Sequence, residues 1–218
     1  MHQDLVRWFL DENGVAHTRT PSAASLEHFQ IRLLLDNIPI EDFMETVIRE
    51  KIPLRVAAVD IEKAEIESAT SSKEIIHYMR RGTDIVNQQL LVRRALEFED
   101  EILPDIIGRL RTSLNDLFIE LSARILAICK KDVSEELIEF YDEIRGAYAR
   151  SMILLALGFK APEGCIPWVI KQFNELKCDY PTEDFCYGAY FALLEMESRF
   201  YSDGRKFSTP PVQSETRL

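Results

Sequence analysis

The segment LGFKAPEGCIPWVIKQF, residues 157–173, constrains the fold more than any other stretch of the chain. We expect one apolar helix to end at Gly158 and the chain to turn at Pro162. A second proline, Pro167, then stands at or just inside the start of the next helix. Proline is tolerated in the first turn of a helix, because the amide there has no acceptor within the helix, but further in it bends the helix. The segment therefore predicts two helices joined by a short connection.

An earlier part of the chain repeats this pattern. An apolar residue followed by proline recurs two predicted helix pairs before Pro167, and each copy precedes a second helix with small residues among leucines. The aligned positions are Leu103-Pro104 with Ile166-Pro167, Phe118 with Phe185, Ser122 with Ala189, and Leu126 with Leu193. An intervening pair, ending IRGAYARSMILLALG, reduces the repeating unit to roughly the low thirties of residues, a period typical of stacked helix pairs.

Apolar residues follow helical spacing along almost the whole chain. Near the N-terminus, the spacing predicts three helices: one with Leu5, Trp8 and Phe9; one capped by Ser25 with Leu26, Phe29, Leu33 and Leu34; and one after Pro39 with Phe43, Met44, Val47 and Ile48. Further along, helices are expected over about 72–81, 84–96, 101–110, 115–126, 134–141, 144–157, 163–176 and 182–201. The connections are short and contain Gly, Pro, Asp or Asn, as neighbouring helices require.

The stretch PLRVAAVDIEKAEIESA, which begins at Pro53, is ambiguous. Its first half has enough Val and Ile to form a strand, whereas its second half has the spacing of a helix with interleaved glutamates. We interpret residues 53–68 as a helix, with part strand as the alternative. The last segment, residues 202–218, has little to bury and is predicted to be disordered.

The junction ALGFKAPEGCIPWVIKQF resembles that between successive units of the HEAT-repeat family, in particular its short bacterial form. The resemblance covers about residues 72–200. It implies an all-α fold, a right-handed α-solenoid of antiparallel helix pairs, over residues 72–201, with residues 1–71 as a helical N-terminal region packed on it. One helix pair cannot bury both of its apolar faces, so neighbouring pairs stack and share one core. Small residues such as Ala147, Ala149 and Gly188 let the helices approach closely.

Composition limits the possible partners. The formal net charge is −11, which argues against generic binding to nucleic acid or to anionic membranes, because both need Lys and Arg to neutralise phosphates. The longest apolar run, Met152 to Leu157, is far shorter than a membrane helix requires. The N-terminus has no pattern of a signal peptide. The four cysteines lack C-x-x-C spacing, so we expect reduced thiols and a cytoplasmic protein.

Known catalytic and cofactor motifs do not occur in the sequence. The eight glycines form neither a dinucleotide-binding nor a P-loop pattern, and no G-x-S-x-G is present. The histidines are scattered and have no cysteine at ligand spacing: His2, His17, His28 and His77. We therefore predict no catalytic residues, no metal and no cofactor.

Two sets of side chains are candidate partner contacts. Arginines recur on successive predicted helices and, if they share one ridge, are suited to an acidic peptide or a phosphate; the set chosen is Arg81, Arg94, Arg111 and Arg124. Aromatic residues surround the last predicted helix, and of these Tyr187 and Tyr190 are added to the candidate site. A terminal repeat has no further neighbour, so we expect either the C-terminal tail or another chain to cover this helix. Local ion pairs for the arginines and core packing for the tyrosines are the alternatives.

These features predict a non-catalytic scaffold that binds a protein or peptide partner. The alternatives are an enzyme or enzyme accessory subunit on a HEAT-like fold, either lyase-like or acting on nucleic acid, and a self-associating structural protein. A nucleic-acid enzyme would need a basic groove, which the net charge disfavours. A homo-oligomer is compatible with each of these functions.

Overall fold

The computed structural model describes residues 2–13, 22–39 and 53–201. All regular elements in these three ranges are helices, so the predicted all-α class is confirmed. The α-helices are α1 His2–Glu12, α2 Ala23–Leu35, α4 Pro53–Ser68, α5 Ser72–Arg81, α6 Ile85–Glu97, α7 Glu99–Leu110, α8 Asp116–Ile128, α9 Ser134–Glu139, α10 Ala147–Lys160, α11 Ile166–Asp179 and α12 Tyr187–Tyr201. Two short 3-10 helices complete the set, η1 Tyr141–Glu143 and η2 Glu163–Cys165.

Residues 53–68 form helix α4, so the helical interpretation of this stretch is confirmed and the strand alternative is wrong. The helix predicted after Pro39 and the tail at 202–218 lie outside the described residues.

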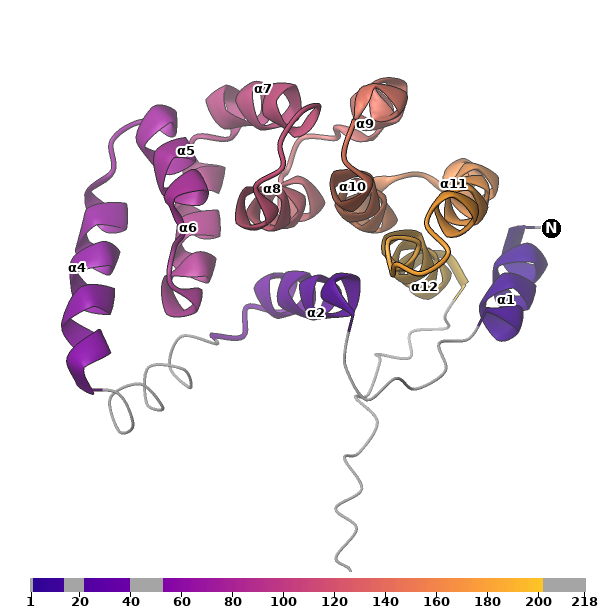
Figure 1. Cartoon of the computed structure of the whole chain (residues 1–218), viewed down its shortest axis with the longest axis horizontal. Helices are drawn as coiled ribbons and strands as arrows, with labels where there is room; N and C mark the ends of the chain where they lie inside the picture. Colours follow the sequence, from indigo (N-terminus) through magenta and orange to yellow (C-terminus); the bar gives the residue numbers. More distant parts are fainter. Residues whose placement is uncertain (1, 14–21, 40–52, 202–218) are drawn as a thin grey trace, which may run out of the picture.

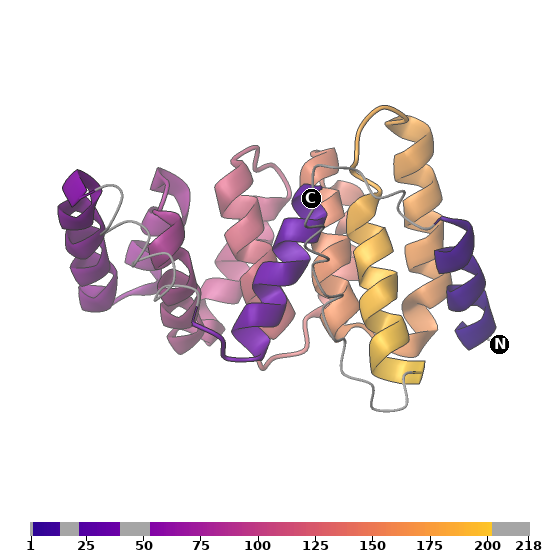
Figure 2. The same ribbon diagram turned by 90° about the horizontal axis from the view of Figure 1, so that it is seen from below.

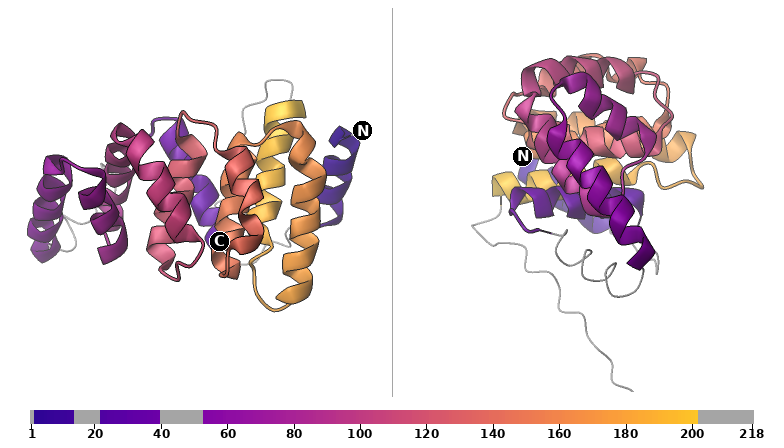
Figure 3. Two further views of the ribbon diagram at one scale, coloured as in Figure 1. Left: turned by 90° about the horizontal axis from the view of Figure 1, so that it is seen from above. Right: turned by 90° about the vertical axis from the view of Figure 1, so that its left-hand side faces the viewer.

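From α4 onward the helices follow one another along an arch (Figure 1). α7, α9 and α11 lie on its outer side, and α8, α10 and α12 lie on its inner side. Along the inner side, α6 contacts α8, α8 contacts α10, and α10 contacts α12. Seen from below, the helices stand in a row from α4 at one end to α1 at the other (Figure 2). Seen from above, α2 lies on the far side of this row (Figure 3).

The first two helices do not continue the row in chain order. α1 packs against α11 and α12, where the rings of Phe9 and Phe173 meet edge to face with centroids 4.8 Å apart. α2 lies across the inner side of the arch, in contact with α8, α10 and α12. The last helix pair is therefore contacted by α1 and α2. Cover by the tail or by another chain lies outside the described residues and stays a prediction.

One apolar core extends from α1 to α12. Ile66, near the end of α4, belongs to it. Val59, two turns earlier, instead packs with Val86 of α6 and Val56 in a small separate cluster. The first half of α4 is therefore joined to the row by a second, smaller set of contacts.

The backbones of α10 and α12 approach each other closely. A Cβ atom added at Gly188 would lie 1.9 Å from the carbonyl oxygen of Ser151, and one at Gly158 would lie 2.5 Å from the Cα of Ala192. The Gly188 amide also donates a hydrogen bond to the Ser151 hydroxyl, at 3.2 Å. Glycine at these two positions lets the two backbones touch.

Short polar side chains cap several of the helix starts. Asp84 and Asn115 accept hydrogen bonds from the first turns of α6 and α8, and Ser71 forms a capping box with Glu74 at the start of α5. Ser22, rather than Ser25, caps α2. Capping by a short polar side chain satisfies an amide that the helix itself leaves without an acceptor.

The two prolines of the repeated pattern differ in position. Pro167 is the second residue of α11, as expected. Pro104 is the sixth residue of α7, because this helix begins at Glu99 and not near Glu101. Without an N–H, Pro104 cannot donate a hydrogen bond to the carbonyl four residues earlier. This loss lowers the stability of the helix, and a proline in the first turn avoids it.

Candidate functional site

The inward face of α2 carries a charge among apolar side chains. Ala24, Ile31 and Leu34 are buried in the main core, with spacing that places them on one side of the helix. Glu27 lies on the same side and is only 5% exposed. A buried carboxylate requires a counter-charge and hydrogen-bond donors, since its desolvation is otherwise too costly.

Arg124 of α8 supplies both. Its Nε donates to Oε2 of Glu27 at 2.6 Å, and its Nη2 donates to Oε1 at 2.7 Å. The third guanidinium nitrogen, Nη1, donates to Oε1 of Gln88 on α6 at 2.9 Å. Arg124 is 3% exposed, so this two-point ion pair is shielded from water. The fork shape of the guanidinium fits a carboxylate in this way, whereas a lysine would make a single contact.

A second ion pair of opposite polarity joins α2 to α12. Glu195 of α12 is 3% exposed, and its Oε1 lies 2.8 Å from Nη2 of Arg32. Its Oε2 lies 3.2 Å from Nε2 of His28. The His28 ring contacts the rings of Phe159 and Phe191, with centroids 5.5 Å and 5.4 Å away.

The surface that receives α2 thus has one buried cation, one buried anion and two aromatic rings. We call it the α2 seat and define it by Gln88, Arg124, Phe159, Phe191 and Glu195. In the structure, Glu27 occupies the cationic end, and His28 with Arg32 occupies the anionic end.

A further carboxyl group lies beside the cationic end of the seat. Tyr148 of α10 donates its hydroxyl to Oε1 of Glu120 on α8 at 2.7 Å. Burial raises the pKa of the Glu120 carboxyl, and the charge of Glu27 acts in the same direction, while the hydrogen bond from Tyr148 and the charge of Arg124 lower it. Burial and the bond to Glu120 also raise the pKa of the Tyr148 hydroxyl.

The raised pKa of Glu120 predicts a pH-dependent effect of the substitution Glu120→Gln. Because the folded-state pKa lies above the unfolded one, the contribution of this group to stability is present below the unfolded pKa and is lost as pH rises through the folded value. Glutamine does not ionise. The free energy of unfolding of the variant, relative to that of the natural chain, should therefore be higher at pH 7 than at pH 4. Urea unfolding of both chains at the two pH values measures this, with Glu136→Gln on the exposed side of α9 as control. An equal difference at both pH values would contradict the prediction.

Three of the four candidate arginines lie at separate places and pair with separate acids. Arg81 lies at the end of α5, Arg94 on α6, and Arg111 directly after α7. Their carboxylate partners are, in the same order, Glu65 at 2.5 Å, Glu97, and Glu143 at 3.1 Å. Each guanidinium also lies over a neighbouring aromatic ring. A shared partner surface formed by all four arginines stays a prediction; Arg124 alone belongs to the α2 seat.

The two candidate tyrosines lie in the first turn of α12, with ring centroids 6.4 Å apart. Tyr190 is 8% exposed and meets the ring of Phe191 edge-on, at 5.6 Å. It therefore borders the α2 seat, while Tyr187 is half-buried further toward the start of the helix.

Four residues that form the contacts across the seat were not among the predicted site residues: Glu27, His28, Arg32 and Glu195. A signal was present in the sequence, since Glu27 shares one side of α2 with Ala24, Ile31 and Leu34. The predicted stripe was instead Leu26, Phe29, Leu33 and Leu34, and of these Leu26 and Phe29 are about half exposed. The buried side of α2 was predicted wrongly because a carboxylate is not expected in a core, and the sequence near α2 does not indicate Arg124 as the counter-charge of Glu27.

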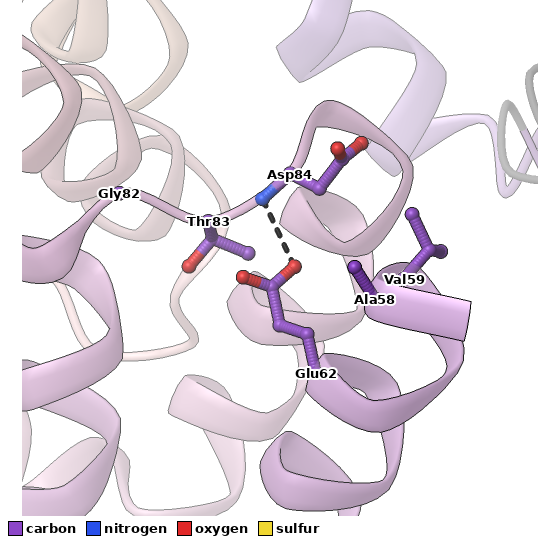
Figure 4. A pocket seen from close by; sticks show the side chains of 6 residues that line it. All are labelled: Ala58, Val59, Glu62, Gly82, Thr83 and Asp84. Carbon is purple, nitrogen blue, oxygen red and sulfur yellow. Dashed lines mark hydrogen bonds between the residues drawn. The ribbon is translucent and has the colours of Figure 1, made fainter. Parts of the chain in front are cut away.

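Two cavities open elsewhere on the described surface. One, of about 300 Å³, lies between α4 and the turn before α6, and its lining is Ala58, Val59, Glu62, Gly82, Thr83 and Asp84 (Figure 4). In it, Glu62 accepts hydrogen bonds from the Asp84 amide at 2.9 Å and from the Asn87 side chain at 2.8 Å. These bonds attach α4 to α6. The other, of about 540 Å³, is lined by Arg80, Arg109, Thr112, Ser113, Leu114, Asn115 and Phe118.

Within the described ranges, no three or more His, Cys, Asp or Glu side chains are grouped so as to hold a metal ion. No helix described is both long and apolar enough to cross a membrane. Comparison of the chain with protein-family models, curated proteins and solved structures found no match.

Proposed function

We propose that this protein is a non-catalytic scaffold that binds a helical segment of a partner protein on the α2 seat. The observation that carries the proposal is that the seat holds a helix of the chain itself through two buried ion pairs of opposite polarity. A surface that positions a helix by shape and by charge has the properties needed to select a helical ligand.

The proposal includes a repeat architecture. We propose that the pairs α5–α6, α7–α8, α9–α10 and α11–α12 are units of a HEAT-like right-handed solenoid, each with antiparallel helices. The contacts of α6, α8, α10 and α12 in succession support this, as does the recurrence of the apolar-proline pattern in α7 and α11. Stacked helix pairs present an extended inner surface, and such surfaces are commonly used for binding.

The proposal is tested by selecting helical peptides from a display library on the immobilised full-length chain. We expect enriched peptides whose binding slows hydrogen exchange in α8, α10 and α12. They should bind at least tenfold more weakly to the double variant Arg32→Glu with Glu195→Lys, which reverses the anionic end of the seat and keeps an ion pair between α2 and α12 with the charges exchanged. The matched control is Glu175→Lys, an exposed carboxylate on the outer helix α11. Peptides that protect only α7, α9 and α11, or that bind the double variant as tightly as the natural chain, would contradict the proposed site, and a selection without enrichment would contradict the function.

A further inference from the structure

We infer that α2 is an exchangeable occupant of its seat and that the partner is an amphipathic helix with the same charge register, a carboxylate followed five residues later by a guanidinium. This inference rests on the proposed function of the same surface and specifies the chemistry of its ligand. The carboxylate takes the place of Glu27 and the guanidinium takes the place of Arg32.

The seat itself dictates these two charges. Arg124 and Glu195 are each 3% exposed and lie on different helices, α8 and α12. Without α2, Arg124 loses both carboxylate contacts and Glu195 loses its contacts with Arg32 and His28. An apolar or uncharged helix on the seat would leave both charges buried and unpaired, which is strongly unfavourable. A ligand must therefore bring one charge of each sign.

The spacing between the charges follows from helix geometry. Five residues advance an α-helix by about 7.5 Å and rotate the side-chain direction by about 140°. Glu27 on the inward face and Arg32 at its edge consequently point in different directions, Glu27 to Arg124 of α8 and Arg32 to Glu195 of α12. A helix with the two charges three or four residues apart would present both on one flank and could pair with only one of the two.

Apolar side chains define the rest of the ligand. Between and beside the two charges, α2 buries Ala24, Ile31 and Leu34, so a small residue is needed three positions before the carboxylate. His28 follows Glu27 directly, and its ring stacks on Phe191 and contacts Phe159, so a planar side chain fits there. The expected ligand is thus a helix with a small residue, an acid, a planar residue, an aliphatic residue and an arginine at the spacing of α2.

The place of α2 in the fold suits exchange. The helices before and after it in the described chain are held elsewhere: α1 packs on α11 and α12, and α4 packs on α6. The outward side of α2 exposes Leu26 at 52% and Phe29 at 50%, so this helix is buried on one side and is not enclosed. Its attachment depends on the seat, and a competing helix with the same register can replace every contact that α2 makes there.

The test uses a fluorescent peptide of residues 22–39 as the probe. It is titrated into the natural full-length chain and into the variant Glu27→Lys, whose lysine faces Arg124 and repels α2 while every seat residue is kept. We expect the peptide to bind the variant at least tenfold more tightly, because the natural chain must first release its own helix. A peptide that itself carries Glu27→Lys should bind the variant at least tenfold more weakly than the unmodified peptide.

The double variant Glu27→Lys with Arg124→Glu is the matched control. It restores an ion pair between α2 and the seat with the charges exchanged, so the unmodified peptide should bind it as weakly as it binds the natural chain. Arg32→Glu, which repels α2 from Glu195, provides a second chain with an open seat. Circular dichroism of each variant measures whether its helix content is retained, and a cooperative urea transition followed by the same signal reports that the helices remain packed.

Equal affinity of the peptide for the natural chain and for both single variants would overturn the inference, as would failure of both single variants to fold, because α2 would then be a fixed part of the structure. The natural chain could instead form a dimer as its concentration rises, and the peptide could dissociate that dimer. This result would assign the seat to α2 of a second copy and would overturn the inference that the ligand is a separate partner. If library peptides without the charge register bind the seat and this peptide does not, the proposed function is supported and the proposed charge register is wrong.

Discussion

The substitution Arg124→Met is expected to lower the free energy of unfolding by about 3–5 kcal/mol. Methionine fills much of the space of the arginine stem, but it leaves Glu27 buried at 5% exposure without its counter-charge and without two hydrogen bonds. The variant avoids this cost only by releasing α2. Urea unfolding measures the global loss, and hydrogen exchange of the α2 amides is expected to accelerate by a factor of about 100 or more relative to those of α11.

Two companion variants make this prediction specific to burial. Adding Glu27→Leu to Arg124→Met removes both charges and should recover most of the lost stability, because a well-packed apolar pair is about as stable as a buried ion pair. Arg109→Met breaks the pair with Asp105, whose two side chains are about 40% exposed, and should change stability by less than about 1 kcal/mol. Equal losses for Arg124→Met and Arg109→Met would show that the Glu27 contact is not a buried ion pair.

Gly188→Ala is expected to destabilise the fold by about 3 kcal/mol. The new methyl group would overlap the Ser151 carbonyl, since the added Cβ would lie 1.9 Å from that oxygen. The atom in the way is backbone in the buried helix α10, so it cannot move aside as the end of a flexible side chain would. Relief requires α12 to shift away from α10, which also disturbs the seat formed by both helices. The midpoint of urea unfolding reports the loss.

The control for this prediction is Gly108→Ala. Gly108 is exposed on α7 and has no atom within 4 Å of an added Cβ. Alanine is the better helix former, so this variant should be more stable by about 0.5–1 kcal/mol. A Gly188→Ala chain as stable as Gly108→Ala would mean that α10 and α12 are not in backbone contact.

Local features were predictable because they depend on neighbours in the sequence. The helix over residues 72–81 and the early proline of α11 were both predicted and are present. The difference at Pro104 shows the limit, since α7 begins before the expected residue and accommodates the proline in its interior. Short-range rules give helix existence better than helix ends, because the ends depend on packing as well as on capping.

The candidate site was predictable only in part. Arg124 was selected from the recurrence of arginines on successive helices, and its burial against Glu27 was not expected. The two residues are 97 positions apart in the sequence, and no local pattern connects a carboxylate on α2 with a guanidinium on α8. Arg81, Arg94 and Arg111 share the pattern with Arg124, yet each has a partner at a different place.

The sequence by itself determined that this protein is helical and where most of its helices lie, because apolar spacing and capping act over three or four residues. Only the tertiary structure decided that α1 covers α11 and α12 and that α2 lies across α8, α10 and α12. The placement of α2 depends on pairing Glu27 with Arg124 and Arg32 with Glu195, and that of α1 on apolar contacts such as Phe9 with Phe173, all between residues far apart in the chain. The physical reason is that a buried charge is stable only opposite its partner, and the fold alone brings the partners together.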